Sequence, residues 1–291
     1  MEVIRIAAHS FTNENNVGFS PEQYSQFKFG SKIIARKFGK ELYDKFISTK
    51  YFLDIVQELQ NSDKRIIVMS SPYVHVPTAT WAMKDYFVRH LNRSLYEYGL
   101  KPIIETKIHR AYSYKEEYGE MNEEQRMSVM KGDTFKVDAD LLENNICLFF
   151  DDIVITGAHE YRICEMLKHY NIQNGSNYFL YFAELIAEDT NPVIENYLNY
   201  YYVKNLVRLN KIMENHDFQM NTRVVKYILD APYDDCKSFL NYQSDTILQT
   251  LYHNAIGNMY NNVPDYKENF MYLENIVKTV ESNWKPTKLS I

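Results

Sequence analysis

The sequence predicts an α/β fold, with a mainly parallel sheet flanked by helices and an all-helical C-terminal region. Three short apolar runs, at residues 64–71, 145–152 and 177–185, have the length and composition of buried strands. Stretches of helical periodicity separate them, and this alternation is typical of a doubly wound sheet. From residue 191 to residue 280 no strand pattern appears, and apolar residues recur every three or four positions.

Length and composition allow one large domain or two modest ones. The chain has 291 residues, and 45% of them are apolar, which is ample for a sizeable core. We expect an α/β domain over residues 1–190, with a helical extension at 20–60. We expect residues 191–291 to form a helical region that could cover the α/β domain as a hood.

The first third of the chain is expected to begin with a short apolar stretch followed by helices. Residues 27–47 place apolar side chains at three- and four-residue steps with lysines between them, so one amphipathic helix is predicted there, and a second at 51–60. The strand at 64–71 ends in "SPYVHVP", where Pro72 and Pro77 prevent regular continuation.

The middle of the chain combines a helix, an extended segment and a long polar stretch. Thr78 or Thr80 could cap a helix that runs to about Glu97, and the segment 99–110 is predicted to be extended. Residues 111–135 are too long and too charged for a simple connection, and such loops are usually lids or binding loops.

The remaining elements follow from the same patterns. A helix is predicted at 158–170, between the second and third strands. In the C-terminal region Pro192, Pro232 and Pro264 divide the helical pattern into about four helices.

Charge and hydropathy argue against several classes of partner. The net charge is −6 and no basic stripe occurs, so we do not expect a nucleic-acid partner. No segment approaches the ~20 apolar residues of a membrane helix, and the N-terminus lacks a secretion-signal pattern, so a cytoplasmic location is expected. The three cysteines, Cys147, Cys164 and Cys236, have no paired spacing and are predicted to be free apolar groups.

Two adjacent acids, Asp151 and Asp152, follow the apolar run "ICLFF". Ligands of open parallel sheets bind beyond the carboxyl ends of the strands, which is where these acids are expected. Paired carboxylates could accept hydrogen bonds from vicinal hydroxyls or lie near a hard cation such as Mg²⁺. The alternative is that both are ordinary turn or cap residues.

The next residues, "ITGAHE", are suited to binding an anion. Gly157 permits a tight turn, the following helix offers free backbone N–H groups, and Thr156 adds a hydroxyl donor. Acids that bind a diol beside a phosphate-binding turn together indicate a phosphorylated sugar as ligand.

The stretch "CLFFDDIVITGAH" resembles the phosphoribosyl-pyrophosphate (PRPP) signature of type I phosphoribosyltransferases. The preceding segment is similar to that of the ComF-like branch, with Arg110, Arg126 and Phe135 in matching places and Met121 where a leucine is usual. The resemblance covers about residues 64–186. It implies a phosphoribosyltransferase-type fold with a five-stranded core sheet.

The resemblance also implies roles for individual residues. Asp151 and Asp152 would bind the ribose diol of PRPP, and a loop would bind its 5-phosphate; that loop consists of Ile155, Thr156, Gly157, Ala158 and His159. Ile155 and His159 depart from the family pattern, because each replaces a threonine. His159 is equally well explained as a solvated first-turn residue.

Pyrophosphate and catalysis are assigned to two further segments by the same resemblance. The pyrophosphate loop would be Ser70, Ser71, Pro72 and Tyr73, although the prolines also suit a plain turn. The charged segment would be a lid whose candidate catalytic cations are Arg110, Arg126 and Lys131. Mg²⁺ would enter with PRPP, with water-mediated contact to Asp151 or Asp152, and no direct protein ligand is assigned.

The predicted function is therefore transfer of a phosphoribosyl group from PRPP to an unidentified nitrogenous acceptor. The resemblance implies that a variable hood selects the acceptor, and this hood could be built from residues 1–60, the helical C-terminal region, or both. The candidate residues there are Lys28, Lys32, Asn221 and Arg223, though helix packing explains each of them too. The main alternative is a non-catalytic sensor of the same fold that binds PRPP or a nucleotide and regulates a partner. A protein-interaction scaffold has no positive support, and a homodimer is left open.

Overall fold

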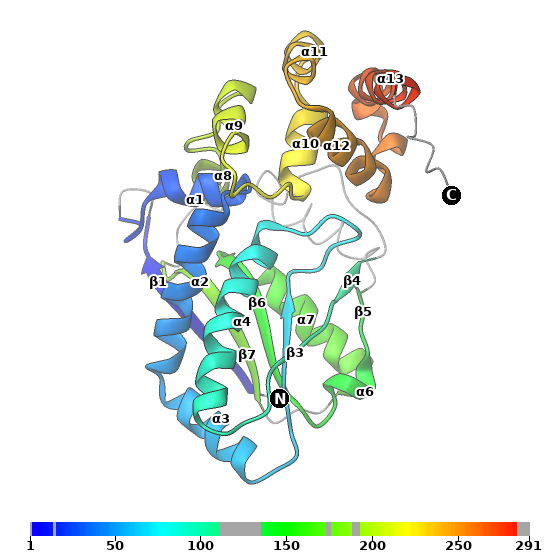
Figure 1. Cartoon of the computed structure of the whole chain (residues 1–291). Helices are drawn as coiled ribbons and strands as arrows, with labels where there is room; N and C mark the ends of the chain where they lie inside the picture. The colour runs from blue at the N-terminus through cyan, green and yellow to red at the C-terminus, as the bar shows by residue number, and fades with distance from the viewer. Residues whose placement is uncertain (1, 14–15, 111–134, 173–175, 188–192, 284–291) are drawn as a thin grey trace, which may run out of the picture.

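The central sheet of the computed structural model has five parallel strands in the order β1-β7-β6-β2-β3. The structure describes residues 2–13, 16–110, 135–172, 176–187 and 193–283. The strands of the sheet are β1 (Glu2–Phe11), β2 (Ile66–Ser70), β3 (Ile104–Glu105), β6 (Ile146–Val154) and β7 (Ser176–Leu185). A mainly parallel sheet flanked by helices, followed by a helical region, confirms the predicted fold class (Figure 1).

Helices cover both faces of the sheet, because each central strand is apolar on both sides. In β6, Leu148 and Phe150 pack with the cluster on one face, and Cys147 and Phe149 pack with the cluster on the other. The first face is covered by α2 (Lys32–Ile47), α3 (Lys50–Gln60) and α4 (Ala79–Glu97), and the second by α6 (Ala139–Leu142) and α7 (Ala158–His169).

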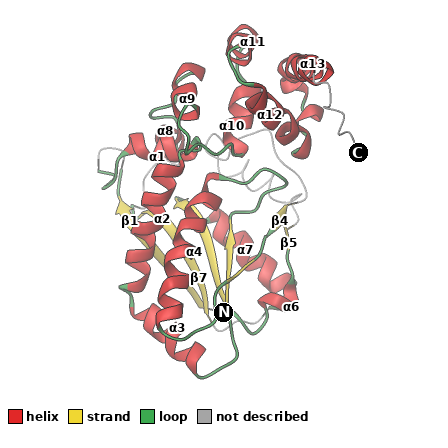
Figure 2. Cartoon of the chain, viewed as in Figure 1, coloured by secondary structure: helices red, strands yellow, loops and turns green. Residues whose placement is uncertain are grey.

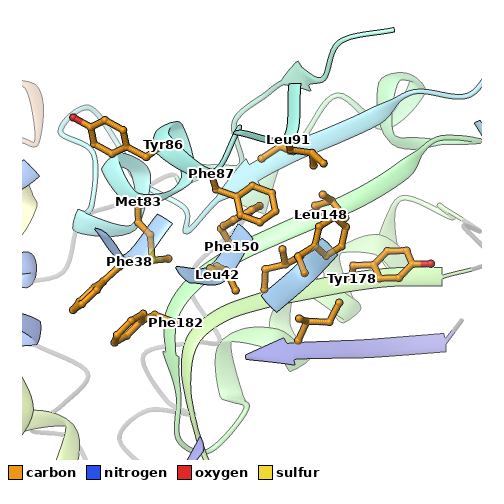
Figure 3. Packing of buried hydrophobic residues seen from close by; sticks show 14 of the residues in the cluster. Phe38, Leu42, Met83, Tyr86, Phe87, Leu91, Leu148, Phe150, Tyr178 and Phe182 are labelled. Carbon is orange, nitrogen blue, oxygen red and sulfur yellow. The ribbon is translucent and has the colours of Figure 1, made fainter. Parts of the chain in front are cut away.

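Aromatic side chains fill much of the first layer. The rings of Phe38 in α2 and Phe182 in β7 stack with centroids 3.6 Å apart, and Phe87 in α4 meets Phe150 edge-on at 4.8 Å (Figure 3). Such pairs add stabilisation beyond the burial of their area. They fix α2 and α4 against the strands that carry the candidate site.

The first strand is a correction to the sequence-based expectation. The short apolar start is β1, which pairs in parallel with β7 along almost its whole length at the edge of the sheet. Ile4 and Ile6 face the core, while Arg5 between them is directed away from it. Because this alternation covers few residues, the sequence pattern was too short to separate a strand from a coil.

A second correction concerns the helix predicted at 27–47, which is two helices. The helix α1 (Pro21–Lys28) ends in a Schellman motif, in which Gly30 N–H bonds Phe27 O and Ser31 N–H bonds Gln26 O. Gly30 has φ +92°, a left-handed value that glycine adopts without strain. The chain therefore turns between α1 and α2.

A small antiparallel pair lies beside the main sheet. It consists of β4 (His109–Arg110) and β5 (Phe135–Lys136), which flank the segment 111–134 in sequence. The predicted lid therefore lies almost wholly outside the described residues, and so do Arg126 and Lys131.

The C-terminal region is entirely helical in its described part, as predicted, but has more helices than the expected four (Figure 2). They are α8 (Ile194–Asn199), α9 (Leu206–Met213), α10 (Thr222–Leu229), α11 (Tyr233–Asn241), α12 (Asp245–Gly257) and α13 (Lys267–Asn283), with short 3₁₀ turns η2 (Tyr260–Asn262) and η3 (Pro264–Tyr266). Polar caps such as Asn205, Asn221 and Ser244 start helices without a proline, which is why prolines alone undercounted them.

Most of this region shares one apolar core. Its cluster runs from Val203 to Val277 and takes in Phe29 and Val76 from the N-terminal part of the chain. Ile194 and Leu198 of α8 belong instead to the apolar cluster between the sheet and helices α2, α3 and α4. The domain boundary at residue 190 stays a prediction.

The helical region docks on the turn between α1 and α2. Gln219 N–H bonds Gly30 O at 2.9 Å, Lys32 N–H bonds Asp217 O at 2.8 Å, and the buried Asn221 donates from Nδ2 to Lys28 O at 3.0 Å. Backbone and amide groups are rigid partners, so these bonds hold the end of α1 firmly.

The same region also holds the loop that follows β2. Thr222 donates from Oγ1 to Val76 O at 2.6 Å and from its backbone N–H to Pro77 O at 3.0 Å. Asn258 Oδ1 accepts from the backbone N–H groups of His75 and Val76 at 3.0 and 2.9 Å. Two loops near the carboxyl ends of the strands are therefore fixed by one helical body (Figure 1).

The cysteines are free, as the sequence predicts. Cys147 and Cys236 are buried, Cys164 is half-buried, and all three are free thiols. Across the described ranges, no helix combines the length and apolar character that crossing a bilayer would require.

Replacing Gly30 by alanine is predicted to loosen this docking. An added Cβ would lie 2.3 Å from Gln219 O, at a backbone where φ is +92°. The positive φ should cost about 1–2 kcal/mol and the overpacking about 1–3 kcal/mol more. Urea denaturation of the Gly30→Ala variant measures the sum as a loss of free energy of unfolding.

Gly99 provides the matched control. It follows α4 in the same type of capping motif, with φ +70°, but an added Cβ meets nothing within 4 Å. Gly99→Ala should therefore show only the backbone cost. Equal losses in the two variants would contradict the docking role of Gly30.

Candidate active site

The two acids lie in β6, near its carboxyl end, and the strand continues two residues beyond them to Val154. Consecutive residues of a strand point to opposite faces of the sheet. Accordingly, a side chain of α1 hydrogen-bonds Asp152 on one face of the sheet, and a side chain of α7 hydrogen-bonds Asp151 on the other. The pleat separates two like charges that are adjacent in sequence, and each is satisfied by a different layer.

Asp152 is buried and paired with a cation. Lys28 Nζ forms an ion pair with Asp152 Oδ2, and the side chains of the pair are only 11% and 8% exposed. Tyr24 donates from its hydroxyl to the same oxygen at 2.6 Å. Tyr24 and Lys28 are four residues apart in α1, so they share the face that points at the acid. Burial, followed by the charge of Asp152, raises the pKa of Tyr24, which keeps its proton on the phenol.

Asp151 is held from the other side. Its Oδ2 lies 2.5 Å from His159 Nδ1, and its Oδ1 accepts from Ser71 Oγ at 2.8 Å and from the backbone N–H of Asp152 at 3.0 Å. Burial raises the pKa of Asp151, but the attraction of His159 and the hydrogen bonds from His159 and Asp152 outweigh it. The pKa of Asp151 therefore lies well below its ordinary value, and the carboxylate is ionised.

A tight turn follows the acids and starts α7. Gly157 has φ +72° and immediately precedes the helix, while Thr156 Oγ1 accepts weakly from Ala158 N–H at 3.4 Å. The first N–H groups of any helix lack partners within it and carry a partial positive charge. Residues 155–159 thus have the geometry of an anion-binding turn.

An acidic side chain also belongs to this turn and is neutralised by the first strand. Glu160 is buried in the first turn of α7, and Arg5 of β1 binds it with two hydrogen bonds, Nε to Oε2 at 2.7 Å and Nη2 to Oε1 at 2.9 Å. The hydrogen bond from Arg5 to Glu160 is the largest reason that the pKa of Arg5 is raised. Arg5 Nη2 would lie 3.0 Å from a Cβ at Gly157, so the guanidinium is next to the turn.

These groups surround one open cavity of about 220 Å³. Its lining comprises both acids and the whole turn, together with residues from α1, the β2–α4 loop, the start of α4, β4, β5, β7 and α8. The lining residues are Lys28, Ser71, Pro72, Thr78, Ala79, Thr80, Arg110, Phe135, Asp151, Asp152, Ile153, Val154, Ile155, Thr156, Gly157, Ala158, His159, Glu160, Arg162, Tyr181 and Glu195.

Most of the residues predicted for PRPP are thus neighbours in space. Asp151, Asp152 and residues 155–159 line the cavity with Ser71, Pro72 and Arg110, while Ser70 and Tyr73 do not. Ser70 is the last residue of β2 and is buried, and Tyr73 lies under the ammonium of Lys107. The candidate cations Arg126 and Lys131 lie outside the described residues. The roles of all these side chains stay predictions.

Comparison with protein families decides the identity of the fold. A family model described as PRTase ComF-like matches residues 4–273, which is nearly the whole chain. The chain belongs to the ComF-like phosphoribosyltransferase family. This family match confirms the resemblance drawn from the signature and extends it from residues 64–186 into β1 and the helical region. None of the curated proteins compared with the chain matches it.

The described side chains around the cavity form no complete set of metal ligands. Within the described ranges, no group of three or more His, Cys, Asp and Glu side chains is placed to hold a metal ion. Three of the four carboxylate oxygens of Asp151 and Asp152 already accept hydrogen bonds from protein groups. The residues present therefore do not fit direct coordination of Mg²⁺.

Sequence reasoning missed four residues of this ComF-like site. Tyr24 and Glu160 were not singled out, Arg5 lies in the unrecognised strand, and Lys28 was considered only for acceptor binding. The four-residue spacing of Tyr24 and Lys28 on one helix face was an available signal. The other hood candidates lie elsewhere: Lys32 begins α2, Asn221 caps α10, and Arg223 stacks on Tyr200 at 5.6 Å.

The pairing of Asp151 predicts a specific dependence of stability on pH. A carboxyl group whose pKa is depressed by folding contributes stability above its unfolded pKa, here 3.8, and loses it as the pH falls further. The free energy of unfolding of the wild type should fall more steeply than that of Asp151→Asn between about pH 5 and pH 2. Urea denaturation at a series of pH values measures both slopes.

Asp44 supplies the control, because it is an exposed acid paired with Lys40 on the surface of α2. Surface pairs of this kind contribute little, so Asp44→Asn should retain the acid slope of the wild type. If Asp151→Asn also retained the acid slope of the wild type, folding would not depress the pKa of Asp151.

Proposed function

We propose that this chain transfers the 5-phosphoribosyl group of PRPP to a nitrogenous acceptor and releases pyrophosphate. The single observation that carries the proposal is that two acids of β6 and the turn at the start of α7 line one cavity, in a chain of the ComF-like phosphoribosyltransferase family. A diol-binding pair and an anion-binding turn side by side match the two ends of a ribose 5-phosphate unit.

The proposed roles follow from the chemistry of each group. Asp151 and Asp152 are assigned as acceptors for the 2- and 3-hydroxyls of the ribose. The backbone N–H groups of residues 157–159 bind the 5-phosphate, with Thr156 as a hydroxyl donor. Arg5 offsets the charge of Glu160, which would otherwise repel a phosphate at this helix terminus.

The reaction itself is a displacement at the anomeric carbon. The bond from C1 to the pyrophosphate oxygen breaks, the bond from C1 to the acceptor nitrogen forms, and that nitrogen loses a proton to solvent. Positive charge develops on the ribose in the transition state, near the paired carboxylates, and negative charge develops on the leaving pyrophosphate. Arg110 lines the cavity and is the described candidate for stabilising the leaving group, with Arg126 and Lys131 as further candidates.

Mg²⁺ is proposed to enter as a complex with PRPP. Pyrophosphate oxygens are good ligands for this ion, which commonly keeps several waters and binds through substrate phosphates. Since the described side chains do not fit direct coordination, no step of the reaction is assigned to the ion.

Isothermal titration with PRPP, with and without Mg²⁺, tests the binding half of the proposal. The wild type should bind, and the double variant Asp151→Asn/Asp152→Asn should lose at least about 100-fold in affinity, because two hydrogen bonds to charged acceptors are weakened. The control Asp44→Asn should bind as the wild type does. Absence of binding to the wild type would refute the proposal.

Pyrophosphate release tests the catalytic half. The protein should release pyrophosphate from PRPP only when a suitable base or amine is present, and the double variant should not. Binding of PRPP without release across a broad panel of acceptors would instead favour the non-catalytic sensor. Arg110→Gln should lower the rate of release more than the affinity for PRPP, because its charge is needed as the leaving group departs.

A further inference from the structure

Lys28 occupies an unusual place for a lysine. Lys28 lines the cavity, yet its side chain is nearly buried and its ammonium is paired with the buried carboxylate of Asp152. Removing two charges from water costs several kcal/mol per ion unless geometry and further hydrogen bonds compensate. Here the compensation is the hydroxyl of Tyr24, which donates to the same carboxylate oxygen as Lys28.

The two donors converge on one oxygen of Asp152. Both Tyr24 and Lys28 reach Oδ2, whereas no described protein group donates to Oδ1. A carboxylate held through one oxygen by two donors has a fixed orientation and retains an acceptor on the other oxygen. Asp152 therefore has one oxygen for the protein and one available to a ligand.

Lys28 is itself held in place by the helical region. Asn221 donates from Nδ2 to Lys28 O at 3.0 Å, and Gln219 binds the carbonyl of Gly30 two residues later. The buried Asn221 also caps α10 by accepting from Val224 N–H at 3.1 Å. The backbone that carries Lys28 is thus tied to the start of a helix.

We propose that Lys28 is a positioning residue that, together with Tyr24, orients the Asp152 carboxylate so that Oδ1 accepts a hydrogen bond from one ribose hydroxyl of the ligand. This inference rests on the proposed function, since it concerns the same cavity. It adds that α1, which lies far from the signature in sequence, determines recognition of the sugar.

The test compares ligands that differ by one hydroxyl. Ribose 5-phosphate, 2-deoxyribose 5-phosphate and 3-deoxyribose 5-phosphate are titrated into the wild type, Lys28→Met, Asp152→Asn and the double variant Lys28→Met/Asp152→Asn. The wild type should prefer ribose 5-phosphate over at least one deoxy ligand by about 10-fold or more, the value of a hydrogen bond to a charged acceptor.

Lys28→Met should reduce this preference to about threefold or less. Its affinity for the deoxy ligand that the wild type binds more weakly should change little. Asp152→Asn should lose the preference for the same hydroxyl, and the double variant should show no further loss, because both changes act on one carboxylate. A merely structural role of Lys28 would weaken all three ligands by the same factor. Equal weakening, or an unchanged preference in Lys28→Met, would overturn the proposal.

Two further variants keep the test decisive if Lys28→Met folds poorly. Tyr24→Phe removes the second donor and leaves the ion pair, so it should reduce the same preference by a smaller factor. Lys28→Arg keeps the charge and should restore most of the preference. If neither variant behaves in this way, the proposal is wrong.

Lys37 supplies the matched control. It is an exposed lysine of α2 that binds Gln23 at the surface, and Lys37→Met should leave all three affinities unchanged. If the wild type binds neither ribose 5-phosphate nor PRPP, the proposed function itself fails. If it binds with a hydroxyl preference that Lys28→Met retains, only the role of Lys28 fails.

Discussion

The structure depends on one electrostatic constraint, which is that two adjacent carboxylates are buried at the end of the central strand β6. Unpaired, they would repel each other and lose their hydration. The pleat of the strand directs them to opposite faces. On one face Lys28 and Tyr24 bind Asp152, and on the other His159 and Ser71 bind Asp151. Helix α1, the β2–α4 loop and helix α7 are therefore brought together at one point, and the cavity forms between them.

The helical C-terminal region stabilises this arrangement from outside. Asn221 and Gln219 hold the turn after Lys28, while Thr222 and Asn258 hold the loop that begins with Ser71. The two segments that supply partners to the two acids are thus bound by the same body. Although the described part of this region contains no strand, it holds both segments that support the acids of the cavity.

The sequence predicted the local features well and the long-range ones poorly. The strand at 145–152, the turn at Gly157 and the helix after it follow from apolar runs, a glycine and helical periodicity, all of which are local signals. The same signals predicted the two acids and the glycine turn that line the cavity. The ion pair between Lys28 and Asp152 joins residues 124 positions apart, and only the fold brings them together. The edge strand β1 was missed because its conformation is set by pairing with β7. The break at Gly30 was missed because a single glycine inside an apolar helical pattern is a weak signal of a helix end.

A double-mutant cycle on Lys28 and Asp152 measures how strongly a partner from a separate layer holds a buried acid of β6. The free energy of unfolding is measured for the wild type, Lys28→Met, Asp152→Asn and the double variant, without ligand. A buried pair of this kind predicts a coupling of about 2 kcal/mol or more, with the double variant more stable than Lys28→Met alone. A coupling below about 0.5 kcal/mol, typical of an exposed pair, would show that Lys28 does not hold Asp152 as a buried partner.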